Sequence, residues 1–175
     1  MSNFGNKISG FFSNLSGGAA ISGCPCGSFY DTTIQSALLI NTAYAMKLNS
    51  VDTDATNLCS VASGSRITVP ESGIYNVQFS AQLQRSSGTN SQVVDIWLRK
   101  NGNDGDVANS NTHVELQGTL NYLVAAWNFY INLNKNNYVE IMWATTSTTI
   151  QLFYDAPLSP HPATPSVIAT INKIS

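Results

Sequence analysis

Two histidines are the side chains of this 175-residue sequence best suited to acid–base chemistry. His113 ends the polar run Asn-Ser-Asn-Thr-His, and His161 stands between two prolines. A catalytic histidine must lie within hydrogen-bond reach of the group whose proton it moves, and a serine or cysteine nucleophile is a common partner. Neither histidine has such a residue, or an acid, at a motif spacing. The sequence therefore predicts no catalytic residues and a protein that is not an enzyme.

Oxygen ligands for a hard cation such as Ca²⁺ gather in one turn. They are Asn101, Asn103, Asp104 and Asp106. An EF-hand loop also needs a glycine at its sixth position and a glutamate at its twelfth, and this frame does not fit. Asp52 and Asp54 form a second acidic pair in a turn-like stretch. Because Asp closes turns through local backbone hydrogen bonds, we interpret both pairs as turn residues and expect no metal.

The three cysteines predict neither a disulfide framework nor a cofactor. Cys24 and Cys26 flank a proline, and Cys59 stands alone. An odd number of cysteines suits synthesis in a reducing cytosol. Zinc binding is the alternative, but three thiolates at this spacing are a weak signal without a fourth ligand. We interpret the cysteines as small apolar groups near a tight turn.

The composition excludes several classes of partner. Only 10% of the residues are charged, against roughly 25% in average domains, whereas Ser, Thr and Asn fill 55 positions. Nucleic-acid binders carry basic patches, and this chain spreads eight cations thinly. No run approaches the ~18 apolar residues of a membrane span, and the start of the chain lacks the apolar centre of a signal peptide. We therefore expect no nucleic acid, no membrane and no secretion.

Residues 1–27 are predicted to form an anchor arm, separate from a domain at 28–175. The arm is rich in glycine and has no acidic residue, yet five apolar residues follow a helical spacing. They are Phe4, Ile8, Phe11, Phe12 and Leu15. A helix this short and glycine-rich needs something to dock against, so we expect these residues to bind a partner. The alternative is an unstructured leader whose spacing arose by chance.

From residue 28 onward the apolar pattern has a period of two, which is typical of half-buried strands. Residues 74–84 alternate between apolar and polar, and apolar residues at every second position share one face in 94–98, 123–133 and 139–143. Leu38, Ile40, Tyr44, Met46 and Leu48 fit one face of a further strand. Further strands are expected at 65–69, 149–154 and 166–174. With turns rich in Gly, Asn and Asp between them, about eight strands predict an all-β, antiparallel two-sheet sandwich with jelly-roll topology.

The stretch at residues 67–81 carries a family resemblance. An apolar-x-Val-Pro strand end, a Gly-x-Tyr restart and a Phe four residues after the Tyr resemble the tumour necrosis factor-like jelly roll, in the version shared with the complement globular head. Segments 94–102, 127–129 and 138–143 are similar to single-domain structural proteins of tailed bacteriophages and related viruses. The resemblance covers about residues 35–174. The collagen repeat of complement-type proteins is missing.

The resemblance implies a homotrimer used for display and binding. In its viral version it implies a virion protein, made in the host cytoplasm and fixed by the arm to another virion protein, most simply the capsid, as a decoration or head fibre. One alternative is a tail-fibre tip that recognises a host surface glycan, and another is a cellular lectin-like module. A third alternative, a cupin-type enzyme, would need a cluster of histidines on facing strands, which two histidines far apart in the sequence do not supply.

Four aromatic residues are predicted to lie at subunit contacts. They are Trp97, Tyr122, Tyr130 and Tyr154. Their polar ends can reach water while their rings pack, a combination that is enriched in protein interfaces. An ordinary place in the core is the alternative for each of them.

Overall fold

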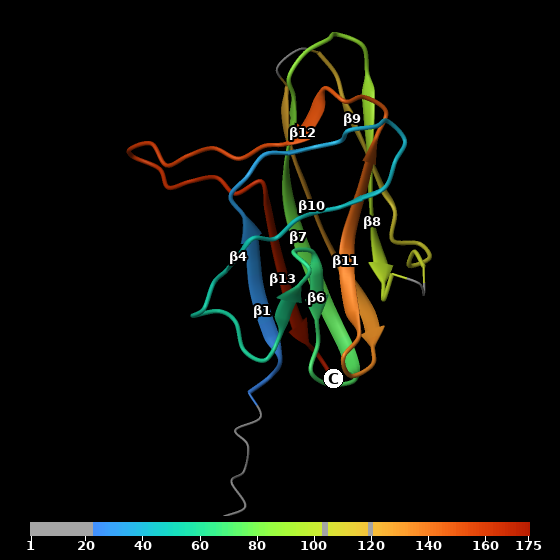
Figure 1. Cartoon of the computed structure of the whole chain (residues 1–175), viewed down its shortest axis with the longest axis vertical. Helices are drawn as coiled ribbons and strands as arrows, with labels where there is room; N and C mark the ends of the chain where they lie inside the picture. The colour runs from blue at the N-terminus through green and yellow to red at the C-terminus, as the bar shows by residue number, and fades with distance from the viewer. Residues whose placement is uncertain (1–22, 103–104, 119–120) are drawn as a thin grey trace, which may run out of the picture.

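The computed structural model describes residues 23–102, 105–118 and 121–175, in which all regular secondary structure is β (Figure 1). The predicted arm therefore lies largely outside the described residues. All five of its predicted anchor residues fall there: Phe4, Ile8, Phe11, Phe12 and Leu15. No helix long and apolar enough to cross a bilayer occurs in the described ranges.

The first sheet is built around one long central strand. Its strands run in the order β10 (Tyr122–Leu133), β7 (Gly73–Arg85), β13 (Val167–Lys173), β1 (Cys26–Asp31) and β4 (Ser50–Val51). Two short strands, β12 (Ile150–Leu152) and β2 (Gln35–Ser36), extend it beside the last residues of β7. Every pairing is antiparallel, and strands far apart in sequence become neighbours, as in a jelly roll.

The second sheet packs against the first and closes the sandwich. Its order is β5 (Ser60–Ala62), β6 (Arg66–Thr68), β11 (Tyr138–Thr145), β8 (Gln92–Lys100) and β9 (Thr112–Leu116). The two-residue strand β3 (Tyr44–Ala45) pairs with the far end of β11. The predicted all-β jelly-roll sandwich is thus confirmed.

The core lies between the sheets because inward residues alternate with polar outward ones. On β7 the side chains of Tyr75, Val77, Phe79, Ala81 and Leu83 are at most 4% exposed. The Tyr75 hydroxyl meets its hydrogen-bonding need by donating to the Glu71 carbonyl at 2.9 Å. The pKa of Tyr75 is raised to about 12, chiefly because burial disfavours the charged phenolate. A phenol this well packed stabilises the fold only while it keeps its proton.

The expected strand at residues 38–48 is wrong for its first half. We call residues 38–48 the strap: residues 38–40 form no strand, and the residues after them run beside β11 at the edge of the second sheet. Leu38 and Ile40 are exposed, whereas Met46 and Leu48 reach the core. Asn41 interrupts the extended chain with a φ of 52° while its N–H donates to the Thr145 carbonyl at 2.8 Å. The strap therefore follows β11 as a short, interrupted edge that pairs with it at β3, instead of forming one continuous strand over residues 38–48.

The structure adds strands that the apolar pattern does not predict. β1 begins at Cys26, so the expected boundary between residues 27 and 28 falls inside a strand. β9 is another addition, with only Val114 and Leu116 directed into the core. In both strands few apolar residues alternate, which leaves the period of two too short to recognise.

Candidate functional site: the uncharged sheet face

The outer surface of the first sheet is the most unusual surface of the described domain. We call the outward side chains of β10, β7, β13 and β1 the neutral face, because none of them is charged. They are Tyr122, Val124, Ala126, Asn128, Tyr130, Asn132, Ile74, Asn76, Gln78, Ser80, Gln82, Gln84, Ile168, Thr170, Asn172, Cys26, Ser28 and Tyr30. Four adjacent strands carrying only amides, hydroxyls, a thiol and apolar groups can be covered by protein without the cost of burying an unpaired ion.

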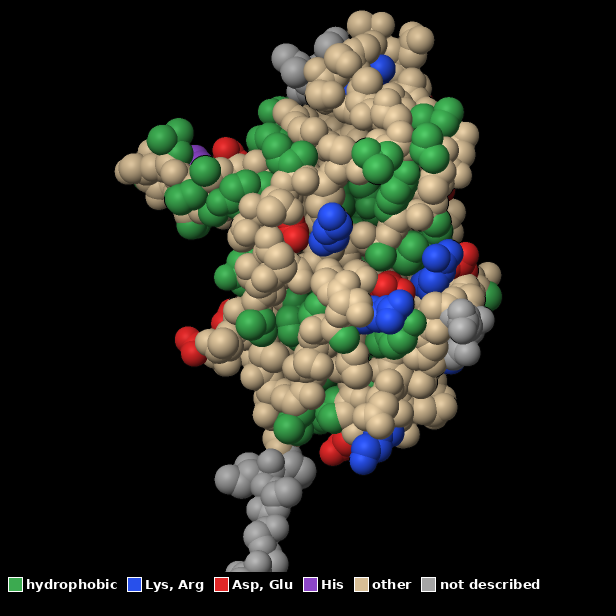
Figure 2. Space-filling model, in the orientation of Figure 1, with side chains coloured by type: hydrophobic (Ala, Val, Ile, Leu, Met, Phe, Trp, Pro, Cys, Tyr) green, Lys and Arg blue, Asp and Glu red, His purple; other side chains and the backbone are tan. Residues whose placement is uncertain are grey.

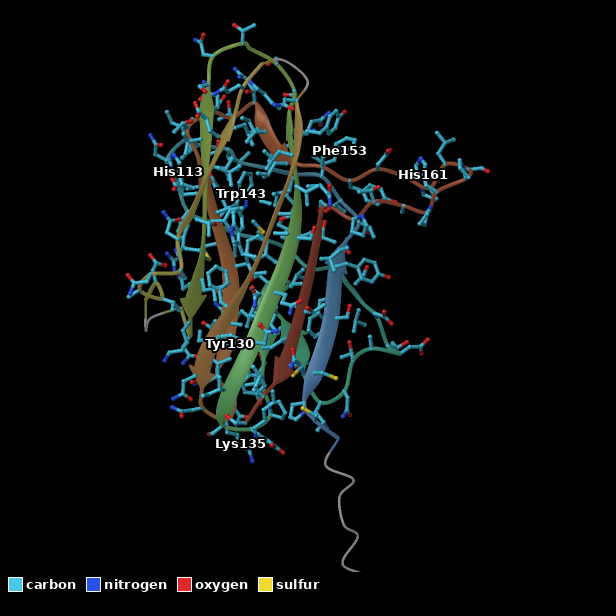
Figure 3. The ribbon with its side chains drawn as sticks, turned by 180° about the vertical axis from the view of Figure 1, so that it is seen from behind. His113, Tyr130, Lys135, Trp143, Phe153 and His161 are labelled. Carbon is cyan, nitrogen blue, oxygen red and sulfur yellow. The ribbon has the colours of Figure 1, made fainter. Side chains whose placement is uncertain are left out.

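Large apolar groups stand exposed on the neutral face. On β10 the side chains of Tyr122, Val124 and Tyr130 are 58%, 56% and 69% exposed. Figure 3 views the molecule from this side, with Tyr130 labelled on β10. An extended set of exposed rings and branched side chains on one sheet is typical of a protein interface.

The upper end of the neutral face is fixed by side-chain contacts. Gln151 donates to Gln84 at 2.5 Å, and Gln84 donates to the Tyr122 hydroxyl at 2.6 Å. The Tyr122 ring meets Phe153 edge to face, with the ring centroids 5.4 Å apart. Because these rings are already ordered in the single chain, a partner docking there loses less conformational entropy.

The middle of the neutral face is recessed. A hollow of about 450 Å³ opens around Gln78, Ala126 and Asn128, where side chains are shorter than at either end of β10. Beside it, at the open edge of the sandwich, the rings of Trp127 and Phe129 are only partly buried against the core. A recessed face and a partly exposed aromatic edge on one molecule suit head-to-tail packing of identical subunits, which can close into a ring.

A projecting arm formed by residues 153–166 stands beside this face. In Figure 1 it leaves the body as an orange-to-red hairpin, and Figure 3 labels Phe153 at its base and His161 far out. Two backbone bridges hold it, between Asp155 and Thr164 and between Leu158 and His161. Leu158 is 69% exposed. A hairpin that holds an apolar residue in solvent offers a contact surface for a neighbouring molecule.

The four predicted interface aromatics do not all lie together. Tyr122 and Tyr130 share the neutral face, and Tyr154 lies, half-buried, at the base of the projecting arm. Trp97 lies on β8, on the outside of the other sheet. The grouping of Val124 with the two tyrosines, and the aromatic edge at Trp127 and Phe129, were missed. The strict alternation along residues 122–133 was the available signal, because it assigns odd and even positions to opposite faces.

The cysteines cluster loosely at the start of β1. Cys24 is exposed and donates to the Lys173 carbonyl at 3.1 Å, while Cys59 is buried. Burial is the main reason that the pKa of the Cys59 thiol rises to about 12. A thiol held protonated is a poor zinc ligand. The described residues contain no group of three or more His, Cys, Asp or Glu placed to hold a metal ion.

The histidines lie far apart, and neither contacts a nucleophile among the described residues. His113 lies on β9 with its Nδ1 3.1 Å from Asp95 Oδ1, a carboxylate partner that the sequence spacing does not reveal. The Nδ1 of His161 lies 3.0 Å from the Pro162 carbonyl on the projecting arm. Of the acidic pairs, Asp52 accepts from the backbone N–H of Asp54 at 3.1 Å, which is a turn contact.

Comparisons with known proteins agree with this architecture. No protein-family model matches the sequence, and no curated protein sequence matches it. Among solved structures, the chain is similar to the Eiger TNF of S. frugiperda, with a TM-score of 0.58 at 7% identity over 87% of this chain and 93% of that one. It is also similar to the globular domain of the zebrafish complement 1qA protein, with a TM-score of 0.52 at 12% identity over 87% and 98% of the two chains. The described domain thus has the jelly-roll fold of tumour necrosis factor-like and complement globular-head domains.

Proposed function

We propose that this protein is a non-enzymatic binding head that assembles as a homotrimer. In the trimer the neutral face of each subunit packs against the open edge of the next one. The observation that carries the proposal is the neutral face itself: none of its outward side chains on four strands is charged, and Tyr122, Val124 and Tyr130 stand exposed on β10. The partly exposed edge rings of Trp127 and Phe129 supply an apolar partner for the face, and Leu158 on the projecting arm is a second apolar group available to a neighbour.

We further propose that the head belongs to a virion and that residues 1–22 attach it to the capsid. Five apolar residues at helical spacing in a segment without acidic residues support an anchor. The motif-level resemblance of segments 94–102, 127–129 and 138–143 to structural proteins of tailed bacteriophages is the reason for proposing a particle. A neutral face suits the close packing of subunits on such a particle, because few charges need to be desolvated.

The oligomeric mass of two chains tests both parts of the proposal. One chain is the full sequence, and the other begins at Gly23, since Pro25 already accepts a hydrogen bond from the Lys173 N–H at 2.8 Å. We expect both to have the mass of a trimer in light scattering. We expect only the full chain to sediment with purified particles of the virus whose genome encodes it.

Each part fails on a different result. A monomer from both chains, at concentrations up to the micromolar range, would remove the trimer. Heads that bind particles equally well without residues 1–22 would remove the anchor. Neighbouring genes that encode only cellular proteins would argue against a virion and for a cellular lectin-like module.

A further inference from the structure

A hollow of about 440 Å³ opens on the outside of the second sheet, across the sandwich from the neutral face. Trp97 forms part of its wall, and five polar side chains surround it. They are Asn41, Asp95, Asp106, Asn109 and Asn111. Its volume lies within the range of about 300–1,000 Å³ that is typical of small-molecule sites.

The sheet itself provides the aromatic part of the hollow. Trp97 and Asp95 stand two residues apart on β8, so both point outward on the same side. Across the ladder, Asp95 faces Ala144 on β11. A methyl side chain at Ala144 leaves room beside the indole, which a larger residue would fill.

The polar walls are held by hydrogen bonds to the sheet. The buried Ser110 hydroxyl accepts from the Leu98 N–H at 3.0 Å and donates to the Val107 carbonyl at 2.7 Å, which ties the 106–111 loop to β8. Asp106 accepts from Arg99 Nε at 2.8 Å, and this hydrogen bond is the main reason that its pKa is lowered. The 106–111 loop and the Asp106 carboxylate therefore keep their positions before any ligand arrives.

Asp95 is oriented in the same way. Its Oδ1 lies 3.1 Å from Asn111 Nδ2, which donates to it, and 3.1 Å from His113 Nδ1. Within the described residues this leaves Asp95 Oδ2 to accept from a ligand. On the opposite rim, the strap places Asn41 at a fixed backbone position through its bond to Thr145.

We propose that this hollow binds a neutral saccharide. The indole of Trp97 offers a flat apolar surface for the C–H groups of a pyranose ring. Two carboxylates accept hydrogen bonds from sugar hydroxyls, and three asparagines both donate and accept. A polyol that presents donors and acceptors around an apolar face is the ligand class that matches this mixture.

The charged side chains around the hollow favour neutral saccharides over acidic ones. Asp95 and Asp106 place two carboxylates in the hollow. The guanidinium of Arg99 is already paired with Asp106 at 2.8 Å and is not free to pair with an acidic sugar. A sialylated or uronic sugar would bring a third carboxylate next to the two in the hollow, and like charges at this range repel. A purely apolar ligand would leave the polar groups unpaired, at a cost for each.

The inference extends the proposed binding function but does not depend on trimer formation. All residues of the hollow come from one chain, and they lie on the sheet that the proposed subunit contact leaves uncovered. A monomeric head would retain the site. Oligomeric mass and saccharide binding, measured on the same sample, therefore fail separately.

The test uses the full chain on an array of neutral and sialylated oligosaccharides. Titrations of the methyl glycosides of glucose, galactose and N-acetylglucosamine follow, with the methyl glycoside of N-acetylneuraminic acid as the acidic comparison. Buffers contain EDTA, and binding is measured by ligand-observed NMR. We expect at least one neutral sugar to bind at least fivefold more tightly than the acidic one.

Two variants locate the binding. Trp97→Ala removes the platform and Ala144→Leu fills the hollow, and each should weaken binding about tenfold or more. Ala62→Leu, on the exposed strand β5, and Trp97→Phe, which keeps a ring, control for folding and chemistry, with melting temperatures measured for all four. The absence of any neutral sugar binding would overturn the proposal. So would binding that requires added Ca²⁺, favours the acidic sugar or survives both Trp97→Ala and Ala144→Leu.

Discussion

Replacing Ala126 with glutamate is the sharpest test of the neutral face as a subunit contact. Ala126 lies halfway along β10, opposite Ser80 on β7, in the recess of the face. In a single chain the new carboxylate points into water and costs little. In the proposed trimer it is covered by the open edge of the neighbouring subunit, whose rings Trp127 and Phe129 supply no cation to pair with it.

The magnitude follows from desolvation. Removing an unpaired carboxylate from water costs several kcal/mol even after the protein relaxes. If this cost destabilises each subunit contact by only about 2.8 kcal/mol, the dissociation constant of that contact rises about 100-fold. A trimer that is stable at micromolar concentration should then dissociate over the same range.

Sedimentation velocity over a dilution series measures the effect. The matched control is Ala62→Glu, which adds the same charge at an exposed position on β5 of the other sheet and should leave the trimer intact. Both variants should keep the wild-type circular dichroism spectrum. If Ala126→Glu remains trimeric at every dilution at which the wild type does, the neutral face is not the contact and the desolvation argument is refuted.

Three further results are expected. Thiol labelling followed by peptide mass spectrometry at pH 8 should modify exposed Cys24 well before Cys59, whose pKa is raised by burial, and equal rates would contradict that burial. Because the folded-state pKa of Cys59 is about 12, above the ordinary thiol value of 9.0, its contribution to stability is complete below pH 9 and declines between pH 9 and 12. Urea unfolding should therefore show a flatter alkaline decline for Cys59→Ala than for the wild type. Ser65→Ala removes a 2.6 Å hydrogen bond to the buried Glu140 carboxylate and should cost about 1–3 kcal/mol in urea unfolding, whereas Ser60→Ala on the exposed edge should cost almost nothing.

The long strands were predictable because burial on one side imposes a strict period of two. β7 and β10 pair over their full length, from Gly73 with Leu133 to Gln84 with Tyr122, and their alternation is unbroken. The strap shows where this reasoning fails. Leu38 and Ile40 fit the same period, but the chain turns at Asn41, and the Tyr44 hydroxyl accepts from the Leu39 N–H at 2.9 Å. A local turn with its own hydrogen bonds overrides an apolar pattern that no neighbouring strand continues.

The two candidate sites differ in how far sequence could locate them. The residues of the neutral face could be predicted one strand at a time, because the alternation along each strand identifies its outward side chains. The saccharide hollow combines the strap at Asn41, β8 at Trp97, the 106–111 loop and β11 at Ala144. Their sequence separations carry no information about contact, since only the sheet order brings them together. Trp97 was selected for its chemistry, but its surroundings could not be assigned.

The distribution of the few charges argues that the neutral face reflects more than a low-charge composition. Three of the four ion pairs of the described domain involve the second sheet: Arg66 with Glu140, Arg99 with Asp106, and Asp95 with His113. The remaining pair, Lys173 with Glu71, lies where β13 ends. Figure 2 shows basic and acidic side chains together on the face of the second sheet. A composition that was merely poor in charge would spread its charged residues over both outer faces. The charged residues in the strands of the first sheet, Asp31, Arg85 and Lys173, are not among its outward residues, which is what a molecule needs if it packs through that face and meets solvent and ligands through the other. The Ala126→Glu and Trp97→Ala variants should therefore have separable effects, the first on oligomeric mass alone and the second on saccharide binding alone.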